Sequence, residues 1–171
     1  MGLRPAKCYR EMEKPYTRQS KSKPRKGYVK GVPEIKIHRF EMGNKKKQFS
    51  RKLSLVSQMN MQIRHNALEA ARMAAHKVLV TGVGEEGYFM KIMVYPFHVL
   101  RENPLATGAG ADRYQTGMRQ SFGKPIGTAA QVRQSQPVIN VWIEAGKEAV
   151  AKEALKIAGH KLPGKCRVVG G

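Results

Sequence analysis

Cysteines are scarce in this sequence of 171 residues, and long apolar runs are missing from it. The two cysteines, Cys8 and Cys166, are too few for a disulfide framework, and neither belongs to a CxxC pair that could hold zinc. We therefore expect reduced, buried thiols. No apolar run approaches the roughly 18 residues of a membrane-spanning helix, and the first residues lack the apolar segment of a signal peptide. The sequence thus predicts no membrane partner.

Catalytic and cofactor-binding patterns are missing too. The carboxylates are scattered, and no serine stands in a nucleophile elbow. If residues 65–76 are helical, His65 and His76 lie about 16 Å apart, too far to share one metal ion. The segment "GVGEEG" (82–87) has dinucleotide-fingerprint spacing, but it follows a predicted helix and precedes a predicted strand, so a plain turn is favoured. We expect no enzyme, no cofactor, no metal and no small-molecule substrate.

Acidic residues are few compared with basic ones. The chain has 32 Lys and Arg against 12 Asp and Glu, a net charge of +20, which a small domain tolerates best when a polyanion neutralises it. Residues 1–52 alone have a net charge of +13, interleaved with Tyr9, Tyr16, Tyr28 and Phe40. This composition indicates phosphate binding. No helix-turn-helix or RRM signature is present, so contacts that follow the shape of a folded RNA are favoured over base-specific DNA reading.

The hydrophobic pattern predicts an α+β fold with two helices packed on a mostly antiparallel sheet. Helices are expected at about 58–80 and at 147–158, the second ending at Gly159. Strands are expected at 34–42, 53–57, 87–97, 136–146 and 164–169. We expect two parts: a basic RNA-binding arm over 1–31, and a single domain over 32–171 with a long loop over 98–125.

The first helix has two contrasting faces. Its predicted sheet-packing face consists of Ile63, Ala67, Ala70, Ala74 and Val78. The opposite face consists of His65, Glu69, Arg72 and His76, and we expect it to be solvated or to face RNA, with Glu69 and Arg72 as an ion pair. Ser57 or Asn60 is the expected N-cap. In the second helix, Glu148 and Lys152 form the expected i,i+4 pair.

The loop at 98–125 has neither helical nor strand periodicity. Its segment "ADRYQTGMRQSFGKP" (111–125) combines glycines, which allow close backbone approach, with cations that reach phosphates and rings that stack. A loop this long in a compact domain is functional or disordered. The composition favours insertion into a crowded anionic cleft.

The same segment carries a family resemblance. The sequence resembles the large-subunit ribosomal protein called number sixteen in bacteria and ten-e in archaea and eukaryotes, and the archaeal branch in particular. The signature residues are Ala111, Asp112, Arg113, Gly117, Met118, Arg119, Phe122, Gly123, Lys124 and Pro125. Four flanking segments also resemble the family: "RPAKCYR" (4–10), "KPY" (14–16), "GVPEIKIHRF" (31–40) and "PGKCRVV" (163–169). The resemblance covers essentially the whole chain.

The resemblance implies an α/β hammerhead-like fold and a structural protein of the large ribosomal subunit, working on the ribosome in the cytoplasm. It implies binding to large-subunit ribosomal RNA beside the aminoacyl-tRNA path, with the loop pointing toward the peptidyl transferase centre. The implied partners are that RNA, tRNA and neighbouring large-subunit proteins. The tRNA-proximal loop residues would be Arg101, Asn103, Gly108, Gly110 and Asp112.

The expected phosphate contacts combine the charge pattern with this resemblance. The expected RNA-binding residues are Arg4, Lys7, Arg10, Lys14, Arg18, Lys21, Lys23, Arg25, Lys26, Lys45, Lys46, Lys47, Arg51, Lys52, Arg113, Arg119 and Lys124. Two alternatives stay open at this point. A basic architectural protein of chromatin would explain the charge but not the glycine-rich loop, and an RNA-modifying enzyme would need a cofactor pocket that the sequence does not show.

Overall fold

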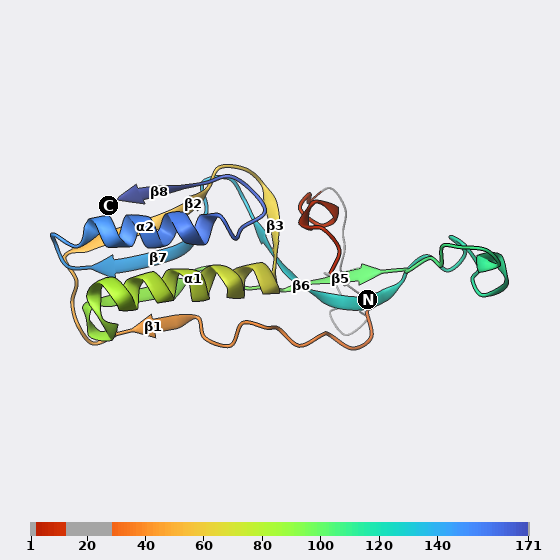
Figure 1. Cartoon of the computed structure of the whole chain (residues 1–171), viewed down its shortest axis with the longest axis horizontal. Coiled ribbons are helices and arrows are strands. Elements are labelled where there is room, and N and C mark those ends of the chain that lie inside the picture. The colour runs from red at the N-terminus through yellow and green to blue at the C-terminus, as the bar shows by residue number, and fades with distance from the viewer. Residues whose placement is uncertain (1–2, 13–28, 171) are drawn as a thin grey trace, which may run out of the picture.

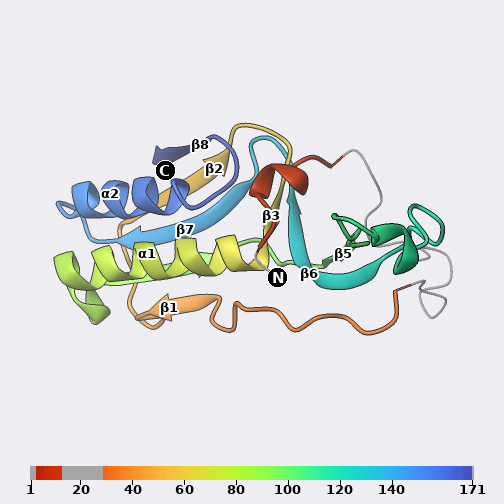
Figure 2. The same cartoon turned by 45° about the vertical axis from the view of Figure 1, so that its right-hand side comes forward.

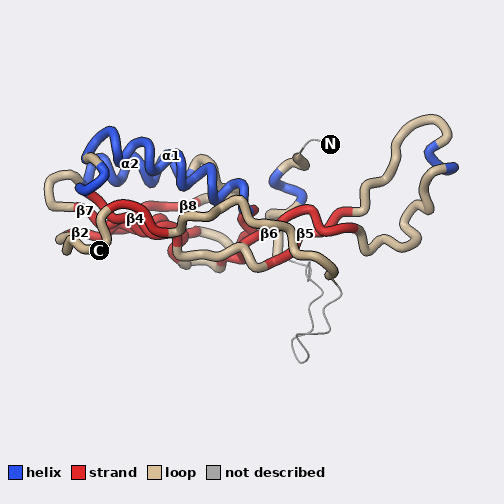
Figure 3. Tube along the Cα trace, turned by 90° about the horizontal axis from the view of Figure 1, so that it is seen from below, coloured by secondary structure: helices blue, strands red, loops and turns tan. Residues whose placement is uncertain are grey.

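The computed structural model describes residues 3–12 and 29–170. Its main body is a five-stranded sheet in the order β1-β4-β7-β2-β8, in which all neighbouring strands are antiparallel. The strands are β1 (Glu41–Gly43), β2 (Arg51–Ser57), β4 (Tyr88–Ile92), β7 (Pro137–Ile143) and β8 (Cys166–Gly170). The helices α1 (His65–Val83) and α2 (Glu148–Gly159) both lie on one face of this sheet (Figure 3). The predicted α+β class is confirmed.

The core lies between the two helices and the sheet. From the sheet it contains alternate residues of each strand, such as Tyr88, Met90 and Ile92 of β4, because successive strand residues point to opposite faces. Small residues let the helices approach closely. A Cβ on Gly82 would lie 2.5 Å from a methyl carbon of Val150.

A second, three-stranded sheet extends the molecule away from this body. Its order is β3-β6-β5, with β3 (Met61–Arg64), β5 (His98–Glu102) and β6 (Lys124–Val132), and both pairings are antiparallel. Strands β5 and β6 form a hairpin that projects from the body with residues 103–123 at its end (Figures 1 and 2). The loop is therefore shorter than the predicted 98–125, because both of its ends are strands.

Most expected elements are confirmed. The strands over 53–57, 87–97, 136–146 and 164–169 correspond to β2, β4, β7 and β8, and the second helix corresponds to α2. The ion pairs Glu69–Arg72 and Glu148–Lys152 both form, the latter with 4.0 Å between the charged atoms. Most of the segment 82–87 is a turn, as predicted: Gly84 ends α1 at a φ of +82°, and Glu85–Gly87 forms one 3₁₀ turn before β4.

The start and the packing face of the first helix were predicted wrongly. Helix α1 begins at His65, because Met61–Arg64 pairs with β6 as strand β3. The expected caps are used elsewhere: the Ser57 hydroxyl donates to the Met59 carbonyl oxygen, and the side-chain Oδ1 of Asn60 accepts from the Gln134 backbone N–H. The buried helix face consists of Leu68, Ala71, Ala75 and Leu79, one position along from the predicted one.

Two further expectations were wrong. The predicted strand over 34–42 contains only β1 at its end. The preceding residues form no ladder; instead the Lys36 amide donates to Nδ1 of His65, 3.2 Å away. The cysteines are not both buried, since Cys8 is exposed and Cys166 is half-buried.

Candidate nucleic-acid interface

The described part of the N-terminal arm is fastened to the second sheet. Gln62 of β3 is buried, and its amide nitrogen donates to the carbonyl oxygens of Tyr9 and Glu11 at 3.0 and 3.1 Å. Its backbone N–H donates to the Arg10 carbonyl oxygen at 2.7 Å. These three bonds place the expected phosphate-binding residues Lys7 and Arg10 beside the hairpin.

Arg4 is tied to the hairpin stem by charge. Its guanidinium forms an ion pair with Glu102 at the end of β5, 2.5 Å between Nε and Oε1, and the Tyr9 hydroxyl donates to the other oxygen of Glu102 at 3.3 Å. Burial, and then the Glu102 charge, raises the pKa of Tyr9 to about 12, which keeps the hydroxyl a donor. The carboxylate of Glu102 thus joins the arm to the stem.

The base of the long loop is closed by a cation and a ring. The guanidinium carbon of Arg101 lies 3.8 Å from the ring centroid of Phe122, and the guanidinium donates to the Phe122 carbonyl oxygen. Gly123 has a φ of +76°, and a Cβ there would lie 2.5 Å from the carbonyl carbon of Glu102. Only glycine lets the two sides of the loop meet at this distance.

The loop itself is held by local bonds and stays exposed. The side-chain amide of Gln115 accepts from the Ala106 backbone N–H at 2.7 Å and donates to its carbonyl oxygen at 3.1 Å, so it joins the two sides as a strand neighbour would. A short 3₁₀ turn, Ala111–Arg113, follows Gly110. Tyr114 is 87% exposed and Met118 70% exposed. The ring of Tyr114 and the side chain of Met118 thus face solvent rather than the core.

The cations at the end of the hairpin are exposed and have no carboxylate partner among the described residues. These cations are Arg113, Arg119 and Lys124. The expected tRNA-proximal residues Asn103, Gly108, Gly110 and Asp112 lie in this loop, and Arg101 lies at its base. The structure therefore gathers the signature segment and its cations at the far end of the hairpin (Figure 1).

The second expected basic cluster lies at the opposite end of the molecule. Residues 44–50, which include the expected RNA-binding residues Lys45, Lys46 and Lys47, form the loop between β1 and β2. Lys46 in this loop has no carboxylate partner in the described ranges. The other cations there are engaged. Lys45 pairs with Glu41, Lys47 with Glu144 and Arg51 with Glu148, while the Lys52 ammonium lies 5.5 Å from the ring centroid of Trp142.

Two of these carboxylates are held firmly in the charged state. Hydrogen bonds from Lys45 and Lys91 lower the pKa of Glu41 to about 2, and a hydrogen bond from Lys47 lowers the pKa of Glu144. Sequence reasoning missed the Lys91–Glu41 and Lys47–Glu144 pairs because their partners lie far apart in the chain. The expected cations Lys14, Arg18, Lys21, Lys23, Arg25 and Lys26 lie outside the described residues.

The polar face of α1, which we expected to be solvated or to face RNA, is not a solvated stripe. Arg72 has only 13% of its side chain exposed, pairs with Glu69 and donates to the sulfur of Met42 at 2.9 Å. Nδ1 of His76 lies 2.6 Å from the Tyr88 hydroxyl oxygen, and burial lowers the pKa of His76. This face packs against β1 and β4 instead of facing solvent.

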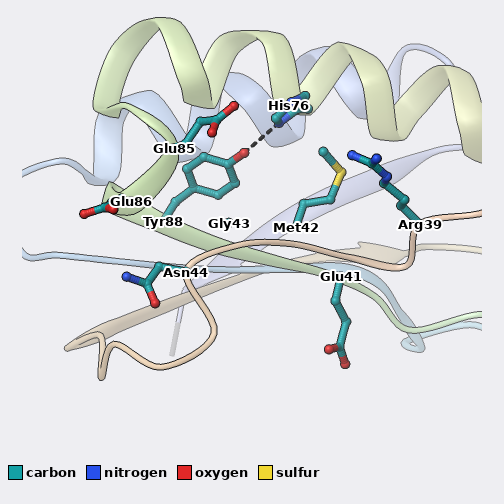
Figure 4. A pocket seen from close by; sticks show the side chains of 9 residues that line it. All are labelled: Arg39, Glu41, Met42, Gly43, Asn44, His76, Glu85, Glu86 and Tyr88. Carbon is teal, nitrogen blue, oxygen red and sulfur yellow. Dashed lines mark hydrogen bonds between the residues drawn. The ribbon is translucent and has the colours of Figure 1, made fainter.

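A pocket of about 750 Å³ opens beside this His76–Tyr88 pair (Figure 4). Arg39 lies at one end of its lining, and Glu85, Glu86 and Asn44 lie toward the other. Its lining has no serine, cysteine or lysine nucleophile. Over the two described ranges, no group of three or more potential ligands could hold a metal ion, and no helix is long and apolar enough to cross a membrane.

Comparison with known proteins gives consistent matches. Residues 13–169 match the family model of ribosomal protein L16p/L10e. Large ribosomal subunit protein uL16 of Methanococcus maripaludis is 46% identical over 169 residues, which cover 99% of this chain and 94% of that protein. The protein of the same name from Staphylothermus marinus is 51% identical over 170 residues, and that from Archaeoglobus fulgidus 41% over 169 residues. These two alignments cover 99% of this chain and 94% and 93% of the relatives.

Proposed function

The chain belongs to the ribosomal protein L16p/L10e family, and we propose that it binds large-subunit ribosomal RNA through its hairpin end and its N-terminal arm. It is a structural protein of the large ribosomal subunit that takes part in translation on the cytoplasmic ribosome, and it is not an enzyme. Family membership removes both alternatives, the chromatin protein and the RNA-modifying enzyme.

One observation carries the proposal: within the described ranges the hairpin cations Arg113, Arg119 and Lys124 have no carboxylate partner, whereas most cations of the β1–β2 loop are already paired. Arg113, Arg119 and Lys124 can each contact a phosphate without first releasing a carboxylate. The exposed ring of Tyr114 can stack on a base beside them. We assign the main RNA contact to this end, together with Lys7 and Arg10 and the basic residues over 13–28. Lys46 is a minor contact at the other end.

The path of the loop supports the finer part of the proposal. Residues 103–123 extend away from both helices, so their shape depends on local bonds and on whatever surrounds them in the subunit (Figures 1 and 3). We propose that the loop lies beside the aminoacyl-tRNA path and points toward the peptidyl transferase centre, as the family resemblance implies. Gly108 and Gly110, with φ of +137° and +75°, give the tip turns that allow close approach to RNA.

A salt-titrated binding assay tests the RNA assignment. The purified protein is titrated with large-subunit ribosomal RNA, an unrelated structured RNA and duplex DNA. We expect ribosomal RNA to bind at least ~10³-fold more tightly than the others, as specific recognition does. Equal affinities that fall together with salt would contradict the proposal, because they describe a simple polycation.

A loop replacement tests the tRNA assignment. Glu102 and Lys124 are opposite each other in the ladder, so a two-residue Asn-Gly turn can replace residues 103–123. We expect the variant to fold, because the loop adds no side chain to the core. It should join large subunits less readily, because Arg113 and Arg119 are removed with the loop, so the comparison is made on the subunits that contain it. Subunits that contain it should bind aminoacyl-tRNA more weakly or form peptide bonds more slowly. Unchanged tRNA binding and peptide-bond formation would refute the proposed position of the loop.

A further inference from the structure

Large apolar side chains on the link between β4 and β5 point to solvent. Burial alternates from β4 through residue 97: Ile92, Val94 and Pro96 are buried, whereas the residues between and after them are exposed. The exposed residues are Met93 at 44%, Tyr95 at 44% and Phe97 at 75%. A contiguous apolar surface of this kind marks an interaction site in most soluble proteins.

The two rings on this link continue a series that starts at Phe40, the residue before β1: Tyr95 stacks on Phe40, and Phe97 is tilted against Tyr95. The Tyr95 ring lies over Phe40 with 5.3 Å between centroids and 21° between planes, and Phe97 lies 4.5 Å from Tyr95 at 48°. The backbone is fixed too, since the Ile92 amide donates to the Phe40 carbonyl oxygen and the Phe97 amide to that of Tyr95. The outermost ring, Phe97, is therefore positioned before any partner arrives, which lowers the entropy cost of binding.

The charges near this stack favour a polyanion. The stack continues the outer side of β4, where Phe89 lies 5.1 Å from Trp142 and the Lys52 ammonium lies over the Trp142 ring. Neither helix covers this side of the sheet (Figure 3). Glu41, the carboxylate of the neighbouring strand, is matched by two lysines, at 2.8 Å from Lys45 and 2.7 Å from Lys91. Because two lysines neutralise the Glu41 carboxylate, it would not repel the phosphates of an RNA strand.

We propose that Tyr95 and Phe97, backed by Phe40, form a stacking platform for an unpaired base of the ribosomal RNA. The inference rests on the proposed RNA-binding function and adds a site that is separate from the long loop. Three aromatic rings in series suit the flat face of a base, and stacking tolerates any base because each has a π face. If a neighbouring protein packed an aliphatic surface here instead, any apolar side chain of similar size would serve, and an aromatic ring would not be required.

Three variants of Phe97 separate these possibilities. Phe97→Ala removes the ring, Phe97→Leu keeps apolar area without a ring, and Phe97→Trp keeps a ring that reports by fluorescence. The last of these is made together with Trp142→Phe, because Trp142 is the only tryptophan in the chain. Met73→Ala is the matched control, since Met73 is a 58% exposed apolar residue on α1, the opposite side of the sheet.

Each variant is titrated with full-length archaeal large-subunit ribosomal RNA over a range of salt. We expect both Phe97→Ala and Phe97→Leu to weaken binding about five- to 150-fold, the range of one base–aromatic stack, with the salt slope unchanged because no phosphate contact is lost. Phe97→Trp should keep wild-type affinity, and its fluorescence should be quenched by the RNA. Met73→Ala should bind as the wild type does.

Two results would overturn the platform. One is wild-type affinity for Phe97→Ala or Phe97→Leu; the other is unquenched fluorescence of the Phe97→Trp variant in a complex that still forms. Either result leaves the proposed function standing as long as the wild-type protein prefers ribosomal RNA. Loss of that preference in the wild type would instead contradict the proposed function itself.

Discussion

Neutralising the three unpaired cations of the hairpin is the sharpest perturbation of the proposed interface. Arg113, Arg119 and Lys124 are replaced together by glutamine, which keeps hydrogen-bonding side chains and removes three charges. All three are exposed, and none has a carboxylate partner within the described residues. The fold should therefore be unaffected, and the change should be confined to RNA binding.

The magnitude follows from counterion release. Each phosphate contact contributes about 0.7 to 0.9 to the slope of log affinity against log salt, so three contacts contribute about two to three units. Between about 50 and 200 mM salt, the wild type should lose ~20- to 40-fold more affinity than the variant. The same replacement of Lys45, Lys46 and Lys47 should change the slope by about one unit or less, because two of these lysines already neutralise Glu41 and Glu144.

The assay is the salt titration with large-subunit ribosomal RNA. A third variant with Lys77, Lys152 and Lys156 replaced by glutamine is the control. It loses the same charge from the exposed side of the helices, where Lys152 pairs with Glu148 at 4.0 Å and the other two lysines have no carboxylate partner among the described residues. We expect the hairpin variant to have the flattest slope of the three. Equal slopes for all three variants would refute the reasoning, since only total charge would then matter.

Three other changes test how the structure is held together. Gly123→Ala should lower the free energy of unfolding by about 2 kcal/mol or more in urea titration, because Gly123 has a positive φ and no space for a Cβ. Gly110→Ala is the control: its φ is similar but its surroundings are open, so it should cost about 1 kcal/mol or less. Gln62→Leu should lower the free energy of unfolding by about 1–3 kcal/mol and speed proteolysis of residues 3–12, because the carbonyl oxygens of Tyr9 and Glu11 lose their donor. An unchanged cleavage rate would contradict the idea that Gln62 holds the arm on the second sheet. The ion pairs of Glu41 lower its pKa from 4.5 to about 2, so they stabilise the fold above pH 4.5, and this stability is lost as the pH falls toward 2. The melting temperature of Glu41→Gln, followed against pH, should lack this part of the acid dependence.

The elements with clean periodicity could be predicted from the sequence. Strand β7 and helix α2 follow period-2 and 3.6-residue patterns. The bounds of α2 lie within one residue of the expected ones, and those of β7 lie within three. Strands β5 and β6 gave no such signal. Val99 and Leu100 are buried in succession, and β6 is buried on both faces at small residues such as Thr128 and Ala129, so neither strand alternates.

The candidate interface could be predicted in composition but not in arrangement. The loop signature and the excess of cations can be read from the chain. Which cations are neutralised depends on contacts such as Lys47–Glu144 and Arg4–Glu102, between residues almost a hundred positions apart. The exposed stack of Phe40, Tyr95 and Phe97 gave no sequence signal either, because alternation along 87–97 predicts a strand without saying which side stays uncovered.

Crosslinking from the hairpin loop inside assembled large subunits tests the central claim most directly. A photoreactive amino acid replaces Tyr114, which is 87% exposed in the loop, and in a second variant it replaces Met73 on α1. We predict that the probe at 114 crosslinks to large-subunit ribosomal RNA at the peptidyl transferase centre or to tRNA bound beside it, and that the probe at 73 does not. Crosslinks from position 114 only to protein, or to RNA far from that centre, would contradict the account.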